Sequence, residues 1–191
     1  MMQIFASDLL SSLHASSSHS ADRKESTKDI RVDIGVTKLP YFMDKAKAIE
    51  ESGEYPSETL QVHLTGFDTL IRILDPKYYP PTHTLKPLEP FLSKHRMRVT
   101  YRTDDQWGAK AVQDEYLAEL GEGRREKESG KREWVTEGKI EMVEGRKEGE
   151  EIVSSTRVRE AVNKGGKGLL KKLVTDGVAD CILEEGLYKE S

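Results

Sequence analysis

Two short segments of the chain carry residue types that could do chemistry, and the first is Gly66-Phe67-Asp68. It follows LQVHLT, which alternates as a β-strand does, and it opens FDTLIRIL, which has helical spacing. Glycine at a strand end lets a ligand approach the backbone because no Cβ intervenes. A carboxylate two residues later can accept hydrogen bonds from sugar hydroxyls. Taken alone, the pattern is more typical of a glycine turn followed by an aspartate that the helix N-terminus stabilises.

The second segment is Val153-Ser154-Ser155-Thr156-Arg157-Val158-Arg159. Hydroxyl side chains at Ser154, Ser155 and Thr156 stand at a predicted helix start, beside backbone N–H groups that have no helical partner. We expect Arg159 in the first turn, where its guanidinium can fork onto phosphate oxygens. The alternative is an ordinary N-cap followed by solvated arginines. One cap needs one hydroxyl, however, and an arginine in the first turn opposes the helix dipole unless an anion is present.

The elements that must position these residues follow from the apolar spacing. Strands are predicted where short apolar runs occur, at RVDIGV, LQVHLTG and MRVTY. Helical spacing predicts helices at 2–13, 38–51, 67–74, 106–120, 156–163, 169–174 and 178–184. A serine-rich loop is expected at 16–28, and the proline-rich PKYYPPTHTLKPLEP is expected to be a connector.

Strands separated by helices predict an α/β domain with a mostly parallel sheet, doubly wound and Rossmann-like. The 191 residues suit a single domain. In such sheets ligands bind beyond the carboxyl ends of the strands. We therefore expect the Gly66–Asp68 turn and residues 154–159 to face one crevice.

Residues 121–151 are rich in Glu, Lys, Arg and Gly and are expected to form a charged, flexible insertion. Its one structured island, REWVTEGKIEMV, is predicted to be a hairpin that turns at Glu137-Gly138. A solvated insertion is the simpler interpretation, and a partner-binding segment is the alternative.

Several segments together resemble one family. VSSTRVR is similar to the ISSTxxR signature of nicotinamide-mononucleotide adenylyltransferases, and HLTGFDTLIRIL is similar to that family's strand followed by GxD. IGVTKLPYFMDKAKAI, GFDTLIRILDPKYY, YRTDDQWG and VSSTRVREAV resemble a fungal branch of such proteins. The closing ADCILEEGLY also looks like the family's final helix. The resemblance covers nearly the whole chain.

The resemblance implies transfer of AMP from ATP to nicotinamide mononucleotide, giving NAD and pyrophosphate with Mg²⁺. Gly66 and Asp68 would contact a nucleotide, with Asp68 at a ribose. Ser154, Ser155, Thr156 and Arg159 would hold the ATP phosphates, and Arg159 would act in catalysis. Arg157 falls on a variable position of the signature and receives no role. Such a transfer depends on positioning and charge neutralisation more than on acid–base groups.

The chain also departs from the family pattern. The family opens with a strand, a loop containing Gly and Pro, and a helix with paired histidines that grip the phosphates, and the sequence shows no such motif. His14 and His19 stand in a serine-rich segment without a preceding strand or glycine loop. We therefore expect a chain truncated at its N-terminus, lacking the first strand of the sheet and impaired in turnover. The alternatives are a non-catalytic nucleotide-binding or interaction protein that keeps the fold, and a fragment that does not fold stably.

Composition limits the other possibilities. A net charge of −4 and a pI near 5.8 argue against nucleic-acid or membrane binding by bulk charge. Cys181 is the only cysteine, which excludes an intramolecular disulfide and fits the cytoplasm or nucleus. No spacing indicates a metal site. His63, on a predicted strand, is expected to be a satisfied sheet histidine. The sequence does not distinguish nicotinamide from nicotinic acid mononucleotide and does not give the oligomeric state.

Overall fold

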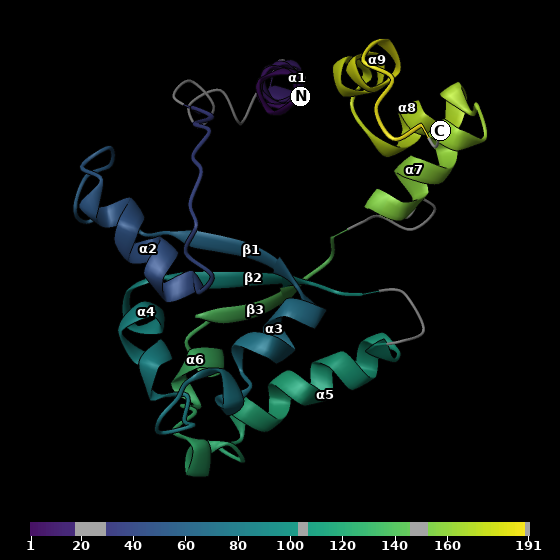
Figure 1. Cartoon of the computed structure of the whole chain (residues 1–191). Coiled ribbons are helices and arrows are strands. Elements are labelled where there is room, and N and C mark those ends of the chain that lie inside the picture. The colour runs from purple at the N-terminus through teal and green to yellow at the C-terminus, as the bar shows by residue number, and fades with distance from the viewer. Residues whose placement is uncertain (18–29, 103–106, 146–152, 190–191) are drawn as a thin grey trace. The chain divides into compact units, whose positions relative to one another are not determined.

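The computed structural model describes residues 1–17, 30–102, 107–145 and 153–189 (Figure 1). The chain divides into two compact units. One comprises Met1–Val36 with Glu148–Ser191, and the other is Thr37–Lys147. The expected single domain stays a prediction.

The Thr37–Lys147 unit is built on a three-stranded sheet. Its strands are β1 (Val62–Gly66), β2 (Arg96–Thr100) and β3 (Ile140–Val143). They lie in the order β1-β2-β3, and both pairings are parallel. The prediction of an α/β fold with a parallel sheet is therefore confirmed, as are the strands at LQVHLTG and MRVTY.

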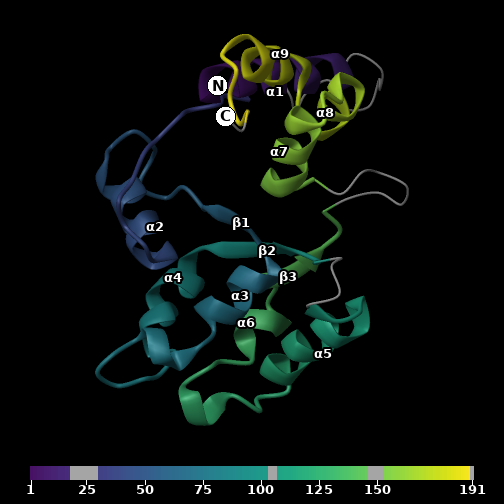
Figure 2. The ribbon, with the colours of Figure 1, turned by 45° about the vertical axis from the view of Figure 1, so that its right-hand side comes forward.

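Helices cover one face of this sheet. They are α2 (Phe42–Glu51), α3 (Phe67–Ile73), α4 (Glu89–Lys94), α5 (Lys110–Gly121) and α6 (Glu133–Thr136), with the 3-10 turns η2 (Pro76–Tyr78), η3 (Lys86–Leu88) and η5 (Glu126–Glu128). In both views α3, α4, α5 and α6 lie on the same side of the strands (Figures 1 and 2). Met97, Val99 and Ile140 point to that side and are fully or almost fully buried. These strand residues form the floor of the core.

Within this unit, the opposite face of the sheet carries exposed side chains. Leu64 and Arg98 are register partners, so their side chains share this face. Leu64 is 74% exposed, and Arg98 pairs with Glu141 of β3 at 3.1 Å across the surface. The core of this unit therefore lies on the helix-covered face alone.

The other unit is helical. It contains α1 (Met2–Ser17), α7 (Ser155–Asn163), α8 (Lys167–Leu173) and α9 (Asp176–Glu184), which confirms the four helices predicted there. Its core is formed by Val158, Ala161, Val162, Leu170, Leu173, Val178, Ala179 and Ile182, with Ile4 of α1 packed against them. A Cβ at Gly177 would lie 2.7 Å from Ile4 Cγ2. The close approach of α1 to α9 therefore requires a glycine at this position.

Two predicted elements are wrong. RVDIGV forms no strand, and Val36 is 95% exposed. Alternating apolar residues favour a strand only where a neighbouring strand accepts the backbone hydrogen bonds, and none of the described strands pairs with this segment. REWVTEGKIEMV is not a hairpin. Its first half is α6, its second half is β3, and β3 pairs in parallel with β2.

The turn inside that segment is nevertheless where the sequence placed it. Gly138 has a φ of +65°, a conformation that glycine adopts without strain, but it joins a helix to a strand. The buried Trp134 fixes α6 against the core. The first part of the charged segment, 121–145, thus has defined structure, while residues 146–151 lie outside the described residues. Flexibility of the insertion stays a prediction.

Helix starts are the other point of difference. α2 begins at Phe42 instead of residue 38, because Pro40 disfavours the helical conformation of Leu39 before it. α5 begins at Lys110, four residues later than predicted. α1 continues through Ser17, and the rest of the expected serine-rich loop, including His19, lies outside the described residues. None of the helices in the described part of the chain is both long and apolar enough to cross a bilayer.

Candidate functional site

The Gly66-Phe67-Asp68 turn lies at the carboxyl end of β1, as predicted. Gly66 is the last residue of β1 and the N-cap of α3, with extended backbone at φ −95° and ψ 162°. Asp68 stands in the first turn of α3, and its side chain is 19% exposed. Its carboxylate forms an ion pair with Arg102, with Arg102 Nε 2.8 Å from Asp68 Oδ1.

Gly66 and Asp68 depend on each other sterically. A Cβ at residue 66 would lie 2.7 Å from Asp68 Oδ1 and 3.7 Å from the Arg102 side chain. Any larger residue would therefore push the carboxylate away from the strand end or break its contact with Arg102. The glycine, two residues before the aspartate, allows the carboxylate to fold back over the end of the strand. This is the physical reason for the GxD spacing.

Arg102 was not among the residues that the sequence predicted for the site. Its backbone is held by the side-chain amide of Gln113 in α5. The Arg102 N–H donates to Gln113 Oε1 at 3.0 Å, and Gln113 Nε2 donates to the Arg102 carbonyl at 2.7 Å. Gln113 Nε2 also donates to the Gly108 carbonyl at 3.1 Å. Gln113 is 0% exposed. One buried amide thus fixes the chain on both sides of residues 103–106.

Aromatic side chains support the turn from the core. Phe67 is buried, and its ring meets those of Trp107 and Tyr116 edge-on, with centroids 6.5 and 5.5 Å apart. Trp107 is thus part of the packing around the core. These contacts fix the start of α3, and with it the direction of Asp68.

Beside Arg102, Tyr101 is tied to α5. Its hydroxyl donates to Asp114 Oδ1 at 2.5 Å, and the Lys110 ammonium lies 4.5 Å from its ring centroid. Burial, with the hydrogen bond to Asp114, raises the pKa of Tyr101 to about 12. Tyr101 therefore stays a neutral donor at physiological pH. Lys110 also pairs with Glu144, so the charges at this edge of the sheet are largely matched.

The second predicted segment lies in the helical unit, at the start of α7. Ser154 is the N-cap, with φ −148° and ψ 155°, and its Oγ accepts a hydrogen bond from the Arg157 N–H at 3.2 Å. Ser155 and Thr156 begin the helix, and their side chains are exposed. A single hydroxyl thus serves as the cap, as the simpler interpretation required, and two further hydroxyls remain at the surface.

α7 begins at Ser155, one residue earlier than predicted. Arg159 is therefore its fifth residue and lies just beyond the first turn, in which it was expected. It is exposed, and its guanidinium carbon lies 5.8 Å from the centroid of the Tyr188 ring. Ser155 and Arg159 are four residues apart and so share one face of the helix. That face combines a hydroxyl, a cation and the first N–H groups of a helix, which is a set that can bind an anion.

The structure thus brings the predicted residues together in two sets. Gly66 and Asp68 meet Arg102 in one unit, while Ser154, Ser155, Thr156 and Arg159 share the start of α7 in the other. A single pocket that contains both sets stays a prediction. Arg102 could have been suspected from its place two residues after β2, because that position is at the ligand-binding edge of a parallel sheet.

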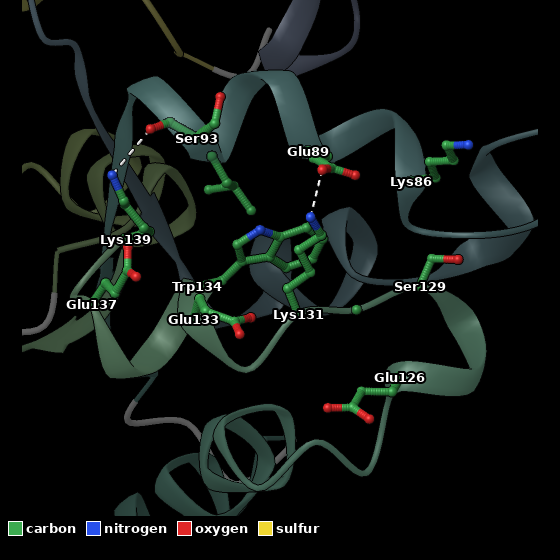
Figure 3. Close-up of a pocket in the computed structure, with 12 residues that line it drawn as sticks. Lys86, Glu89, Ser93, Glu126, Ser129, Lys131, Glu133, Trp134, Glu137 and Lys139 are labelled. Carbon is green, nitrogen blue, oxygen red and sulfur yellow. Dashed lines mark hydrogen bonds and ion pairs between the residues drawn. The ribbon is translucent and has the colours of Figure 1, made fainter.

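A separate hollow of about 710 Å³ lies at the opposite, amino-terminal end of the strands. Its walls include Ser93, just before β2, and Lys139, just before β3 (Figure 3). Lys131 pairs there with Glu89, and Lys139 donates to the Ser93 carbonyl at 3.1 Å. The charged groups in this hollow are thus partly paired with one another, and none of the predicted site residues lines it.

Two histidines of this unit, His63 and His95, are engaged within the protein. His63 Nε2 lies 3.1 Å from Gln61 Oε1, and its ring packs between Phe42 and Phe91, so the expectation of a satisfied sheet histidine is confirmed. His95 Nδ1 accepts from the Gln61 N–H, and its Nε2 lies 3.2 Å from Glu50 Oε1. Among the residues that the structure describes, no group of three or more His, Cys, Asp or Glu side chains could hold a metal ion.

Comparison with known proteins supports the resemblance. The chain is 31% identical over 157 residues to a protein of Schizosaccharomyces pombe named "Putative nicotinamide mononucleotide adenylyltransferase". The match covers 79% of this chain and 57% of the relative, so the chain spans a little over half of the relative's length. No family model matches the chain. No solved structure matches it.

This relative and the parallel sheet agree with the sequence motifs. The sheet order, the glycine at the end of β1 and the aspartate in α3 are consistent with a Rossmann-like nucleotidyltransferase fold. The chain thus resembles the nicotinamide mononucleotide adenylyltransferases in its sequence and in its parallel sheet.

Proposed function

We propose that this protein binds ATP and nicotinamide mononucleotide for adenylyl transfer. In this reaction a phosphate oxygen of the mononucleotide attacks the α-phosphorus of ATP. The bond from that phosphorus to the bridging oxygen breaks, and NAD and pyrophosphate are formed. Mg²⁺ enters with ATP as part of the substrate. The observation that carries the proposal is the Asp68 carboxylate, held by Arg102 over Gly66 at the carboxyl end of β1.

Asp68 is suited to a ribose. Its carboxylate is ion-paired through Oδ1 and remains partly exposed, so that it can also accept hydrogen bonds from a vicinal diol. Gly66 presents backbone without a Cβ at the same strand end. Both residues lie where ligands bind in parallel α/β sheets. We assign them to a nucleotide ribose.

The start of α7 is suited to phosphates. The exposed Ser155 and Thr156 hydroxyls, the first N–H groups of the helix and Arg159 carry donors of the kind that phosphate oxygens accept. We propose that the adenylyl donor's phosphates bind here and that Arg159 neutralises charge that develops during transfer. Arg159 would then leave its contact with Tyr188 or use that ring as a support.

Nucleotide binding without transfer is a second candidate function. It is favoured by one observation, which is that the 191 residues contain no Gly- and Pro-containing loop followed by a helix with paired histidines. Losing one donor to a transition state commonly lowers the rate by about 10²–10³-fold. We therefore expect weak turnover from these residues. A coupled assay for NAD separates the two functions, because binding without transfer releases no pyrophosphate.

Calorimetry tests the binding. ATP with Mg²⁺ and, separately, nicotinamide mononucleotide are titrated into the purified chain and into Asp68→Ala, Arg159→Met and Arg132→Met. Arg132 pairs with Glu126 on the surface before α6, and Arg132→Met serves as the matched control for Arg159→Met. We expect Asp68→Ala and Arg159→Met each to weaken the binding of at least one nucleotide about tenfold. The affinities of Arg132→Met should be unchanged. Absence of binding to both nucleotides by the unmodified chain would contradict the proposal.

A further inference from the structure

The contact between Asp68 and Arg102 suggests a role for a residue outside the two predicted segments. Arg102 reaches Asp68 through Nε, at 2.8 Å from Oδ1. This contact with the planar guanidinium holds one carboxylate oxygen in place and restricts how the carboxylate can turn. The two side chains are 45% and 19% exposed, so the pair lies at a solvent-accessible edge where a ligand can reach the carboxylate.

Surface ion pairs commonly contribute little to stability, because solvent screens them and both side chains lose freedom. This pair differs in how it is supported. The Arg102 backbone donates one hydrogen bond to the wholly buried Gln113 and accepts another from it. The backbone from which the arginine side chain extends is therefore fixed. On the other side, the missing Cβ of Gly66 leaves the space that Asp68 Oδ1 occupies. Elements from three parts of the chain thus fix one carboxylate.

We infer that Arg102 is a positioning residue that sets the Asp68 carboxylate for recognition of ribose hydroxyls and so distinguishes ribonucleotides from deoxyribonucleotides. This inference rests on the proposed function, in which Asp68 binds a ribose. A carboxylate held by one oxygen and packed against Gly66 presents its remaining lone pairs over a restricted range of directions. A hydroxyl that lies within that range gains a charge-assisted hydrogen bond, and a deoxyribose at the same place does not.

The test compares affinities for ribose and deoxyribose forms. The dissociation constants of ATP, 2′-deoxy-ATP and 3′-deoxy-ATP with Mg²⁺, and of nicotinamide mononucleotide and its 2′-deoxy form, are measured by calorimetry for the unmodified chain. The same titrations are made for Arg102→Met, Arg102→Lys and Asp68→Asn, with Arg132→Met as the control. The quantity of interest is the ratio of the deoxy to the ribo dissociation constant.

We expect a ratio of about 10 or more for at least one ribonucleotide with the unmodified chain and with Arg132→Met. In Arg102→Met and Asp68→Asn the ratio falls close to 1, while the affinity for the deoxy form changes less than about twofold. Arg102→Lys restores part of the ratio, because an ammonium can still donate to Oδ1. In a double variant that combines Arg102→Met with Asp68→Asn, the ratio is no lower than in Asp68→Asn alone, since both residues act through one carboxylate.

Two results overturn the inference. In the first, Arg102→Met keeps the full ratio of the deoxy to the ribo dissociation constant. In the second, it weakens the binding of the ribo and deoxy forms equally, which is the result expected if Arg102 has only a structural role. Failure of the proposed function has a different signature, in which the unmodified chain binds neither nucleotide or Asp68→Asn leaves every affinity unchanged. Thermal melts of each variant show which ones fold, and Arg102→Lys keeps the long cationic side chain should Arg102→Met unfold.

Discussion

The buried side-chain amide of Gln113 bonds both the N–H and the carbonyl of Arg102, at 3.0 and 2.7 Å. This relationship joins the core of the sheet unit to its ligand-binding edge, because Arg102 in turn contacts Asp68. Gln113 satisfies two backbone groups that would otherwise be unpaired after the end of β2. The amide therefore acts on both stability and site geometry.

Gln113→Leu removes these hydrogen bonds while keeping the approximate volume of the side chain. We expect the free energy of unfolding to fall by about 2–3 kcal/mol, because three part-buried hydrogen bonds to the backbone are lost together. Urea denaturation followed by circular dichroism measures the change. The control is Gln3→Leu, at an exposed position of α1, which we expect to stay within about 0.5 kcal/mol. Equal effects of the two substitutions would show that the Gln113 bonds contribute nothing.

Gly66→Ala tests the steric dependence of Asp68 on Gly66. The new Cβ would lie 2.7 Å from Asp68 Oδ1, so the carboxylate must rotate and lose its fixed contact with Arg102. The backbone at Gly66 is extended and tolerates alanine, so we expect little loss of stability and about a tenfold loss of nucleotide affinity. The matched control is Gly35→Ala, where a Cβ meets nothing within 4 Å. Unchanged affinity in Gly66→Ala would contradict this account of the GxD spacing.

The two histidines at the amino end of the sheet predict a pH dependence of stability. Burial lowers the pKa of His95 despite the opposing charge of Glu50, and burial followed by the charge of His95 lowers the pKa of His63. The unfolded chain therefore binds protons on these groups more readily than the folded protein does. The neutral histidines therefore contribute to the free energy of unfolding. This contribution is fully present above about pH 6.5 and is lost as pH falls through their pKa values in the folded protein.

We expect the melting temperature to decrease between pH 7.5 and 5, since protonation of His95 Nδ1 would remove its acceptance of the Gln61 N–H. Thermal unfolding across this range measures the effect. His95→Gln should flatten the profile, while the same change at the exposed His83 should leave the slope intact. A profile with the same slope in His95→Gln as in the unmodified chain would rule out this cluster as the cause.

The sequence predicted the fold best where apolar spacing and turn residues agreed. LQVHLTG and FDTLIRIL were placed correctly because a glycine separates a strand pattern from a helix pattern. RVDIGV had the alternation of a strand but lacks a pairing partner among the described strands, which is a tertiary property. The island before β3 was mistaken for a hairpin because its Glu137-Gly138 turn looks the same locally whether a helix or a strand precedes it.

The candidate site was predictable only in part, for a similar reason. Gly66, Asp68 and the α7 hydroxyls stand at element boundaries that sequence patterns reveal. Arg102 and Gln113 act through contacts between residues eleven apart that belong to a loop and a helix. A buried glutamine inside AVQDEYL has no local signal that separates it from the exposed polar residues beside it. Side-chain contacts across elements were therefore needed to find the support of Asp68.

Hydrogen–deuterium exchange with ATP and Mg²⁺, and separately with nicotinamide mononucleotide, tests the central claim most directly, because the Gly66–Asp68 turn and the start of α7 are each proposed to bind a nucleotide. We predict slower exchange in peptides that cover 66–72 and in peptides that cover 154–160 with at least one of the two nucleotides. Asp68→Ala should reduce the protection of 66–72. Unchanged exchange in either segment at saturating concentrations of both nucleotides would contradict the account.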